Sequence, residues 1–121
     1  MAQYVKILEI VAQDKAVQGD RVDVIVLMKN ISNSQVKIYG VAVVDSLRII
    51  DWPWMWVPAG VEVSFAGAFL MGGTDVTIRA QSWYEGIDGY LYKDDEMTKD
   101  VKLSEQIPTF GEFVISDYRK V

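Results

Sequence analysis

The most unusual run of residues with a possible chemical role is DWPWMWV, at residues 51–57. Alternate side chains of an extended chain share a face, so Trp52, Trp54 and Trp56 would lie on one face together. Three coplanar indoles would form a stacking platform for the C–H groups of sugar rings. The alternatives are a protein-binding patch, or a structural or self-association role in which neighbouring groups cover the rings.

A second aromatic group surrounds a tight turn that the run EGIDG predicts at residues 85–89. Tyr84, Tyr90 and Tyr92 flank this turn, and Trp83 is close to it in the sequence. Loop tips rich in tyrosine and glycine suit recognition, which makes the three tyrosines candidate binding residues. Cross-strand aromatic pairs also stabilise hairpins by about 0.2–1 kcal/mol each, and that explanation is sufficient here.

Three adjacent carboxylates, Asp94, Asp95 and Glu96, form the main acidic cluster, with Asp88 nearby. Oxygen ligands of this kind suit Ca²⁺, but the spacing does not match an EF-hand loop. Neighbouring carboxylates on a strand point to opposite faces and cannot share an ion unless a β-bulge turns one of them. A pair of glycosidase carboxylates is a further alternative. The simplest interpretation is a solvated acidic loop, or a bulge that interrupts a strand.

The composition excludes several kinds of site. The 121-residue chain contains no histidine and no cysteine, which rules out disulfides, Cys/His zinc sites, cysteine nucleophiles and Ser-His-Asp triads. The formal net charge of −5 disfavours nucleic acid and anionic membrane surfaces as partners. No run approaches the ~20 apolar residues of a membrane-spanning helix, so we expect no membrane insertion. We also expect no cofactor.

The elements that must position these residues are predicted by a two-residue alternation of apolar and polar side chains, which is typical of half-buried strands. About seven to eight strands are expected before residue 105, and we find no convincing helix. This pattern predicts an all-β fold, an immunoglobulin-like antiparallel sandwich. The predicted strands cover residues 4–12, 21–31, 36–44, 46–50, 61–70, 75–84 and 90–103, the last interrupted at 94–96.

The alternation also predicts which faces are buried. In the strand at residues 21–31, one face carries only apolar side chains and is assigned to the core. In the first strand, the same pattern puts Val5, Ile7 and Val11 on one face. The core-facing residues predicted in the strand at 21–31 are Val22, Val24, Val26 and Met28.

Residues 1–105 are therefore predicted to form one sandwich domain, and residues 106–121 a separate segment. Pro108 precedes the run FGEFVI at 110–115, which resembles the chain's own first strand. This segment is expected to be an extra strand of the domain or the start of a following repeat. A lone strand with an unpaired edge invites pairing with a neighbouring chain.

The tripeptide Asn30-Ile31-Ser32 matches the N-glycosylation acceptor pattern. Such a tripeptide matters only in a secretory host, and it arises commonly by chance.

Two parts of the sequence resemble a known family. Residues 19–30 (GDRVDVIVLMKN) are similar to the G-x-x-V-x-V-x-V-x-V-x-N stretch of bacterial and archaeal immunoglobulin-like modules, notably CARDB, the cell adhesion related domain of bacteria. Residues 65–71 (FAGAFLM) and 76–80 (VTIRA) resemble a later pair of strands in that group, with Gly72 in place of the usual proline. The resemblance spans residues 4–104. It implies a non-catalytic spacer, adhesion unit, or virion or surface-protein domain, often in tandem, with an extracellular, cell-surface or virion location favoured over a cytoplasmic one.

These observations favour a non-enzymatic structural or adhesion module that contacts another protein or a second copy of itself. The alternative is a carbohydrate-binding module that uses Trp52, Trp54 and Trp56. A third hypothesis, an acid/base hydrolase that uses Asp94 and Glu96, is retained only to be tested.

Overall fold

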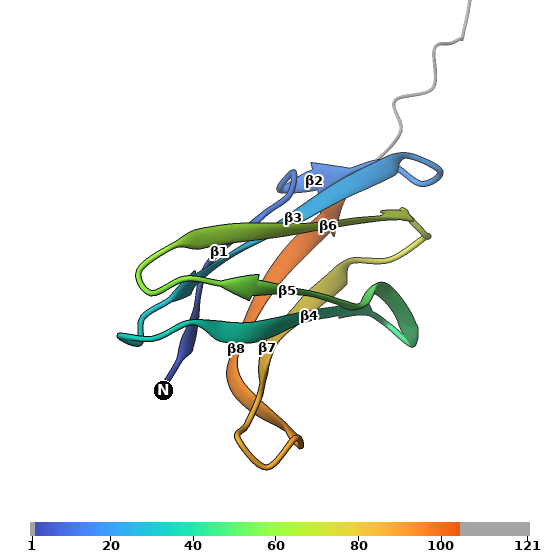
Figure 1. The fold of residues 1–121 in the computed structure, drawn as a ribbon. Coiled ribbons are helices and arrows are strands. Elements are labelled where there is room, and N and C mark those ends of the chain that lie inside the picture. Colours follow the sequence, from blue (N-terminus) through green and yellow to red (C-terminus); the bar gives the residue numbers. More distant parts are fainter. Residues whose placement is uncertain (1, 105–121) are drawn as a thin grey trace, which may run out of the picture.

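The computed structural model describes residues 2–104, and all regular structure in this part of the chain is β (Figure 1). The prediction of an all-β chain with seven to eight strands is confirmed. The segment predicted at residues 106–121 lies outside the described residues. No helix within residues 2–104 is long and apolar enough to cross a membrane. The eight strands are β1 (Val5–Val11), β2 (Lys15–Ala16), β3 (Arg21–Asn30), β4 (Val36–Val44), β5 (Leu47–Val57), β6 (Glu62–Leu70), β7 (Val76–Glu85) and β8 (Leu91–Leu103).

The strands form two sheets. A three-stranded sheet has the order β1-β3-β6, and a five-stranded sheet has the order β2-β8-β7-β4-β5. Every pairing is antiparallel except that of β2 with β8, which is parallel. The chain crosses between the sheets after β1, β2, β3, β5 and β6, so the two sheets share one core (Figure 1).

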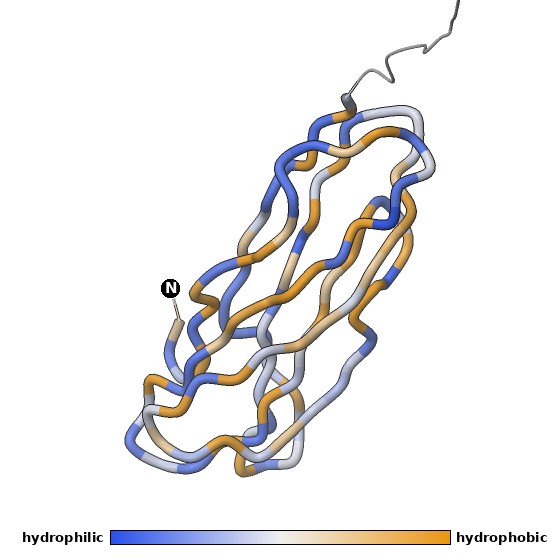
Figure 2. The backbone as a smooth tube through the Cα atoms, turned by 90° about the horizontal axis from the view of Figure 1, so that it is seen from above, coloured by the Kyte–Doolittle hydropathy of each residue, from blue (hydrophilic) through white to orange (hydrophobic). Residues whose placement is uncertain are grey.

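The core lies between the inner faces of the two sheets. Hydrophobic and hydrophilic positions alternate along the strands in Figure 2, as half-buried strands require. The core prediction for β3 is confirmed, because Val22, Val24, Val26 and Met28 are each 0% exposed. The sheets approach closely at Gly40, where an added Cβ would lie 2.6 Å from the ring of Phe65 on the facing sheet.

A bulge in β1 makes the face assignment of the first strand wrong. Ile7 pairs with Met28 and Glu9 with Leu27, so Leu8 is an extra residue in the ladder. One extra residue reverses the phase of the side chains that follow. Ile10 therefore joins the core, and Val11 is exposed.

A second bulge shapes β5, which is longer than the short strand predicted at residues 46–50 and includes the tryptophan run. Trp54 pairs with Tyr39 and Asp51 with Val41, which leaves Trp52 and Pro53 opposite the single residue between them on β4. Trp52 has a φ of 62°, in the left-handed region. Because β5 is an edge strand, a proline is tolerated within it.

Asn30, the first residue of the glycosylation tripeptide, is buried in the folded protein. Asn30 is 0% exposed, and its Nδ2 donates hydrogen bonds of 2.8 Å to the carbonyl oxygens of Ser34 and Val57. Its Oδ1 accepts from the backbone nitrogen and the hydroxyl of Ser32. The tripeptide therefore serves as a buried support for the β3–β4 loop and for the end of β5.

Candidate functional site

The outer side of the five-stranded sheet carries a group of large aromatic side chains, which we call the aromatic face. Tyr39 on β4 lies between Trp54 of β5 and Trp83 of β7, because both are its cross-strand partners. Cross-strand partners share a face of the sheet, and the inward neighbour Ile38 is in the core. The members of the aromatic face are Tyr39, Trp52, Trp54, Trp56 and Trp83.

The rings of this face form an interlocked cluster and not a flat platform. Trp52 lies edge-on to Tyr39, at 6.3 Å and 70°, and edge-on to Trp83, at 5.1 Å and 65°. Tyr39 meets Trp54 at 6.5 Å and 42°. The bulge at Trp52 turns its indole onto its neighbours, so the expectation of coplanar indoles is wrong. Edge-to-face pairs of this kind stabilise the cluster itself.

A lysine covers part of the aromatic face. The Lys37 ammonium lies 4.1 Å above the ring of Trp54 and 5.5 Å from that of Tyr39. It also forms an ion pair of 3.3 Å with Glu85, which accepts a hydrogen bond from the Tyr39 hydroxyl. The interaction with Tyr39, followed by that with Glu85, raises the pKa of Lys37 against the opposing effect of burial. The ammonium is therefore held charged over the indole, as a cation–π contact requires.

Exposure divides the aromatic face into two parts. Trp54 and Trp56 are 53% and 55% exposed, whereas Trp52 and Trp83 are partly buried against each other. Val41 lies on the same side of β4 as Tyr39 and is only 4% exposed, although it is not part of the core between the sheets. Part of the aromatic face, around Val41, Trp52 and Trp83, therefore buries apolar surface outside the main core. The other part, Trp54 and Trp56, remains accessible.

The structure places most of the predicted tyrosines apart from the tryptophans, although Tyr84 lines a pocket of about 440 Å³ together with Trp56. Tyr84 follows Trp83 on β7 and points to the opposite side of the sheet, where it stacks on Tyr92 at 5.6 Å and contacts Tyr4 at 4.6 Å. Burial, followed by the nearby Tyr4, raises the pKa of Tyr84. Tyr90, at 71% exposed, lies in the hairpin turn. The tyrosines therefore belong to the end of the β7–β8 hairpin and do not extend the aromatic face.

Asp88 holds this hairpin turn together. Its carboxylate accepts hydrogen bonds from the Tyr92 hydroxyl and from the backbone nitrogen of Tyr90. The first of these bonds is the main cause of a lowered Asp88 pKa and of a raised Tyr92 pKa.

The predicted bulge in β8 is confirmed, and it directs a carboxylate toward the other sheet. Ser82 pairs with Asp95 and Trp83 with Lys93, so Asp94 is the extra residue. The Asp94 carboxylate accepts hydrogen bonds from three consecutive backbone nitrogens at the start of β1. These donors are Gln3 at 2.8 Å, Tyr4 at 2.7 Å and Val5 at 2.6 Å.

Asp95 extends the same connection between the sheets. Its carboxylate accepts a bond of 2.9 Å from the backbone nitrogen of Ile7. Its own backbone nitrogen donates to the hydroxyl of Ser82, which donates in turn to the carbonyl of Val5 at 2.8 Å. Ser82 is 0% exposed. We call this set of bonds, made by Asp94, Asp95 and Ser82 to β1, the carboxylate seam.

The acidic cluster is therefore neither a solvated loop nor a set of free ligands. Glu96 is paired with Lys93 at 3.0 Å and with Arg79 at 3.3 Å, and Lys93 is the main cause of its lowered pKa. Within the described residues, no group of three or more Asp or Glu side chains is placed to hold a metal ion.

Sequence reasoning missed three members of the site: Lys37, Tyr39 and Glu85. The alternation along residues 36–44 indicated that Lys37 and Tyr39 share a face of their strand. Nothing in the sequence indicated which strands would lie on each side of β4.

No protein-family model matches the sequence, and the curated proteins give no match. Among solved structures, the chain is similar to the sporulation control protein Spo0M from Bacillus subtilis, with a TM-score of 0.52 and 13% identity over 84% of this chain and 51% of that one. This chain thus spans about half the length of Spo0M. Weaker likenesses link it to a Niemann-Pick type C2 protein from the Japanese carpenter ant (TM-score 0.39, 9% identity, 84% of this chain and 96% of that one) and to a β-glucosidase from Listeria innocua (TM-score 0.37, 14% identity, 84% and 16%). At this identity the likeness to Spo0M concerns the fold alone, and the two weaker ones carry no argument.

Proposed function

We propose that this chain is a non-catalytic module that contacts another protein, or a second copy of itself, through the aromatic face. The observation that carries the proposal is the exposure of Trp54 and Trp56, 53% and 55%, beside the charged Lys37 on one side of a sheet. Tryptophan and tyrosine are enriched at the centres of protein interfaces, where they supply large contact areas with few rotatable bonds.

The carboxylates support a module without catalytic chemistry. A general acid and base need free carboxyl groups that flank a substrate site. Asp94 and Asp95 instead accept backbone hydrogen bonds from β1, and Glu96 is engaged by two cations. With no histidine or cysteine in the chain, these carboxylates were the strongest catalytic candidates.

The proposal includes an immunoglobulin-like sandwich of the CARDB-like, adhesion-related type. In its favour, β1 and β2 lie in different sheets, and the order β8-β7-β4-β5 is that of strands G, F, C and C′ in the larger sheet of variable-type sandwiches. The two crossings β3 to β4 and β5 to β6 are also those expected for Greek-key connections.

Carbohydrate binding by the tryptophans is the less favoured alternative. A sugar ring needs an open aromatic face, but Lys37 lies 4.1 Å above Trp54, and Trp52 is edge-on to two neighbours. Trp56 is the indole with the fewest such contacts.

Sedimentation at several concentrations, combined with tryptophan fluorescence during titration with a panel of polysaccharides, tests the proposal. If the face binds a second copy, the average mass rises with concentration, and Trp54→Ala and Trp56→Ala each reduce the rise. Leu70→Ala is the matched control, since Leu70 is 71% exposed on the three-stranded sheet. A fluorescence shift with one polysaccharide, lost in Trp56→Ala, would replace the proposal by the carbohydrate alternative, and turnover of any substrate would overturn it.

A further inference from the structure

A pocket of about 440 Å³ lies where the aromatic face meets the β7–β8 hairpin turn; we call it the hairpin pocket. Its lining residues come from the start of β4, the ends of β5 and β7, and the loops beside them. Trp56 is the member of the aromatic face that borders it. The pocket therefore gives this exposed indole a concave surface beside it.

The walls of the hairpin pocket are mainly aromatic and aliphatic. Trp56 is 55% exposed, and Ile87 in the hairpin turn is fully exposed. Tyr4 and Tyr84 both line the pocket, and their rings lie 4.6 Å apart. These walls suit an apolar group with a flat surface that can lie against an aromatic ring.

The charges at the pocket favour one kind of partner. Lys37 and Glu85, which both line it, neutralise each other at 3.3 Å. Asp88 lies directly beside it, because a Cβ added to the lining residue Gly86 would be 2.8 Å from Asp88 Oδ1. Both hydrogen bonds to the Asp88 carboxylate come from uncharged donors, so its negative charge remains. A second copy, with the same acidic rim and a net charge of −5, would be repelled, whereas a segment with a basic residue would be attracted.

The edge of β5 next to the pocket is poorly suited to a partner strand. Pro53 has no backbone N–H, and the carbonyl of Val57 already accepts a bond of 2.8 Å from Asn30 Nδ2. Two groups that strand addition could use are therefore missing. Polyproline II segments need no such pairing, because they bind aromatic-lined grooves through their side chains and carbonyl groups.

From these features we infer that the hairpin pocket binds an extended, proline-rich segment of another protein, with a proline ring against Trp56 and a basic residue beside Asp88. The indole nitrogen of Trp56 and the side-chain amide of Gln35, another lining residue, can donate to carbonyl groups that a polyproline II segment leaves free. The inference rests on the proposed function, for which it names the class of partner.

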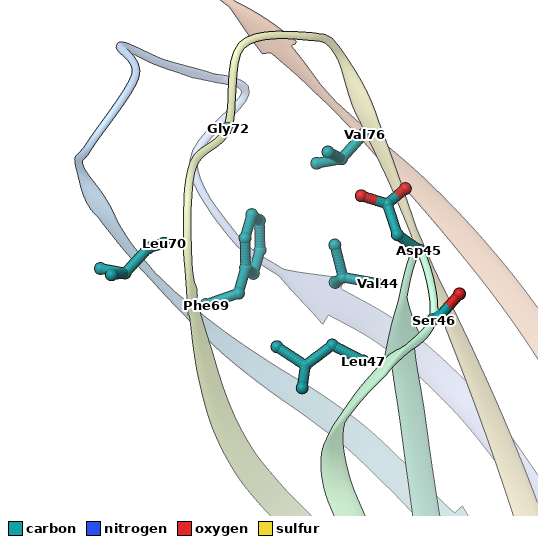
Figure 3. A pocket seen from close by; sticks show the side chains of 8 residues that line it. All are labelled: Val44, Asp45, Ser46, Leu47, Phe69, Leu70, Gly72 and Val76. Atoms are coloured by element: carbon teal, nitrogen blue, oxygen red, sulfur yellow. The ribbon is translucent and has the colours of Figure 1, made fainter.

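The pocket in Figure 3, of about 470 Å³, lies at the other ends of β4, β5 and β7. Val44, Leu47, Phe69 and Val76 form its apolar wall. This wall is aliphatic apart from one phenylalanine, and the hydrophobic effect is non-directional, so the wall singles out no class of ligand. Leu47 is 59% exposed there, on the same strand as Trp56, which makes it a matched control residue.

Calorimetric titration of the full chain with three capped peptides tests the inference. The peptides are an oligoproline that ends in arginine, the same oligoproline ending in glutamate, and a glycine-serine peptide ending in arginine. We expect the first to bind most tightly and the second about threefold more weakly at low salt, with the difference lost at high salt. The glycine-serine peptide should show no binding.

Variants and NMR locate the binding site. Trp56→Ala should lower the affinity for the arginine oligoproline roughly tenfold, as expected for the loss of an aromatic anchor, and Leu47→Ala should leave it unchanged. In the natural protein, the amide signals of Gln35, Gly86 and Ile87 should shift during the titration, which requires no variant.

Absence of binding would overturn the inference, as would equal affinities for the arginine and glutamate oligoprolines. Equal losses in Trp54→Ala and Trp56→Ala would place the peptide on the aromatic face outside the pocket and would also overturn it. In each of these cases, sedimentation that still shows self-association through the aromatic face would leave the proposed function standing, so the two failures can be told apart.

Discussion

The aromatic face and the carboxylate seam both belong to the five-stranded sheet, and both stand out in the sequence as clusters of reactive or binding side chains. In the seam, the carboxylates of Asp94 and Asp95 accept hydrogen bonds from backbone nitrogens at and just before the start of β1. On the aromatic face, Trp54 and Trp56 remain more than half exposed. The acidic residues are engaged within the fold, whereas the outer indoles keep more than half of their surface accessible even though Lys37 lies over part of Trp54.

This difference shows what decides whether a conspicuous cluster is available for function. A strand at the edge of a sheet leaves a row of backbone donors without partners, and β1 is such a strand. Backbone donors that fold away from water need an acceptor, and the bulge in β8 supplies one through Asp94 for the partly buried nitrogens of Tyr4 and Val5. No comparable requirement acts on Trp54 and Trp56, which makes them the better candidates for an external partner.

Removing the Asp94 carboxylate should have the largest effect. Asp94→Ala leaves the backbone nitrogens of Gln3, Tyr4 and Val5, at and just before the start of β1, without their acceptor, so we expect the free energy of unfolding to fall by about 3 kcal/mol. Urea denaturation measures the change. Glu96→Ala is the matched control, because its exposed ion pairs should contribute about 1 kcal/mol or less. Equal losses in the two variants would mean that the seam does not stabilise the fold.

Removing the Ser82 hydroxyl should have the next largest effect. Ser82→Ala leaves the carbonyl of Val5 and the backbone nitrogen of Asp95 unpaired at a fully buried position. We expect a loss of about 2 kcal/mol in the same denaturation experiment. Ser64→Ala, on the exposed side of β6, should change stability by less than about 0.5 kcal/mol. A Ser82→Ala variant as stable as the natural protein would contradict the described role of the hydroxyl.

Truncating an outer indole should affect stability less than either change in the seam. Trp54→Ala removes the cation–π contact with Lys37 and one contact with Tyr39. We expect the free energy of unfolding to fall by about 1 kcal/mol or less, because the side chain is more than half exposed. Thermal unfolding followed by circular dichroism measures the change. A loss as large as that in Asp94→Ala would show that the aromatic face is structural and not available to a partner.

The smallest effect concerns the hairpin turn at extremes of pH. The bond from Tyr92 lowers the pKa of Asp88, so its contribution is present above the pKa of the unfolded carboxyl and is lost as pH falls through the lowered folded value. The same bond raises the pKa of Tyr92, whose contribution is present below the pKa of the unfolded phenol and is lost as pH rises through the raised folded value.

Asp88→Asn should therefore return the Tyr92 pKa toward its ordinary value, as followed by an NMR titration of the Tyr92 ring. Asp100→Asn, whose side chain contacts Thr77, serves as the control and should leave that titration unchanged. If Asp88→Asn also leaves it unchanged, the hydrogen bond between Tyr92 and Asp88 is not the cause of the raised pKa.

Much of the fold could be predicted from alternation alone. The strand at residues 36–44 has the predicted bounds, and the core face of β3 is as predicted, because a two-residue period fixes which side chains are buried together. The faces of β1 could not be predicted in this way. A bulge at Leu8 reverses the phase without any distinctive residue type to mark it.

The candidate site shows the same limit more strongly. The sequence alone identified the tryptophans and the acidic cluster and located a bulge near Asp94, since these depend on residue type and local order. The sequence could not place Tyr39 between Trp54 and Trp83, bring Lys37 over an indole, or bring the start of β1 to Asp94, 89 residues away from Val5. These contacts were decided by the order of strands in the two sheets, because long-range pairing depends on how the faces of many strands are buried together and not on any local pattern.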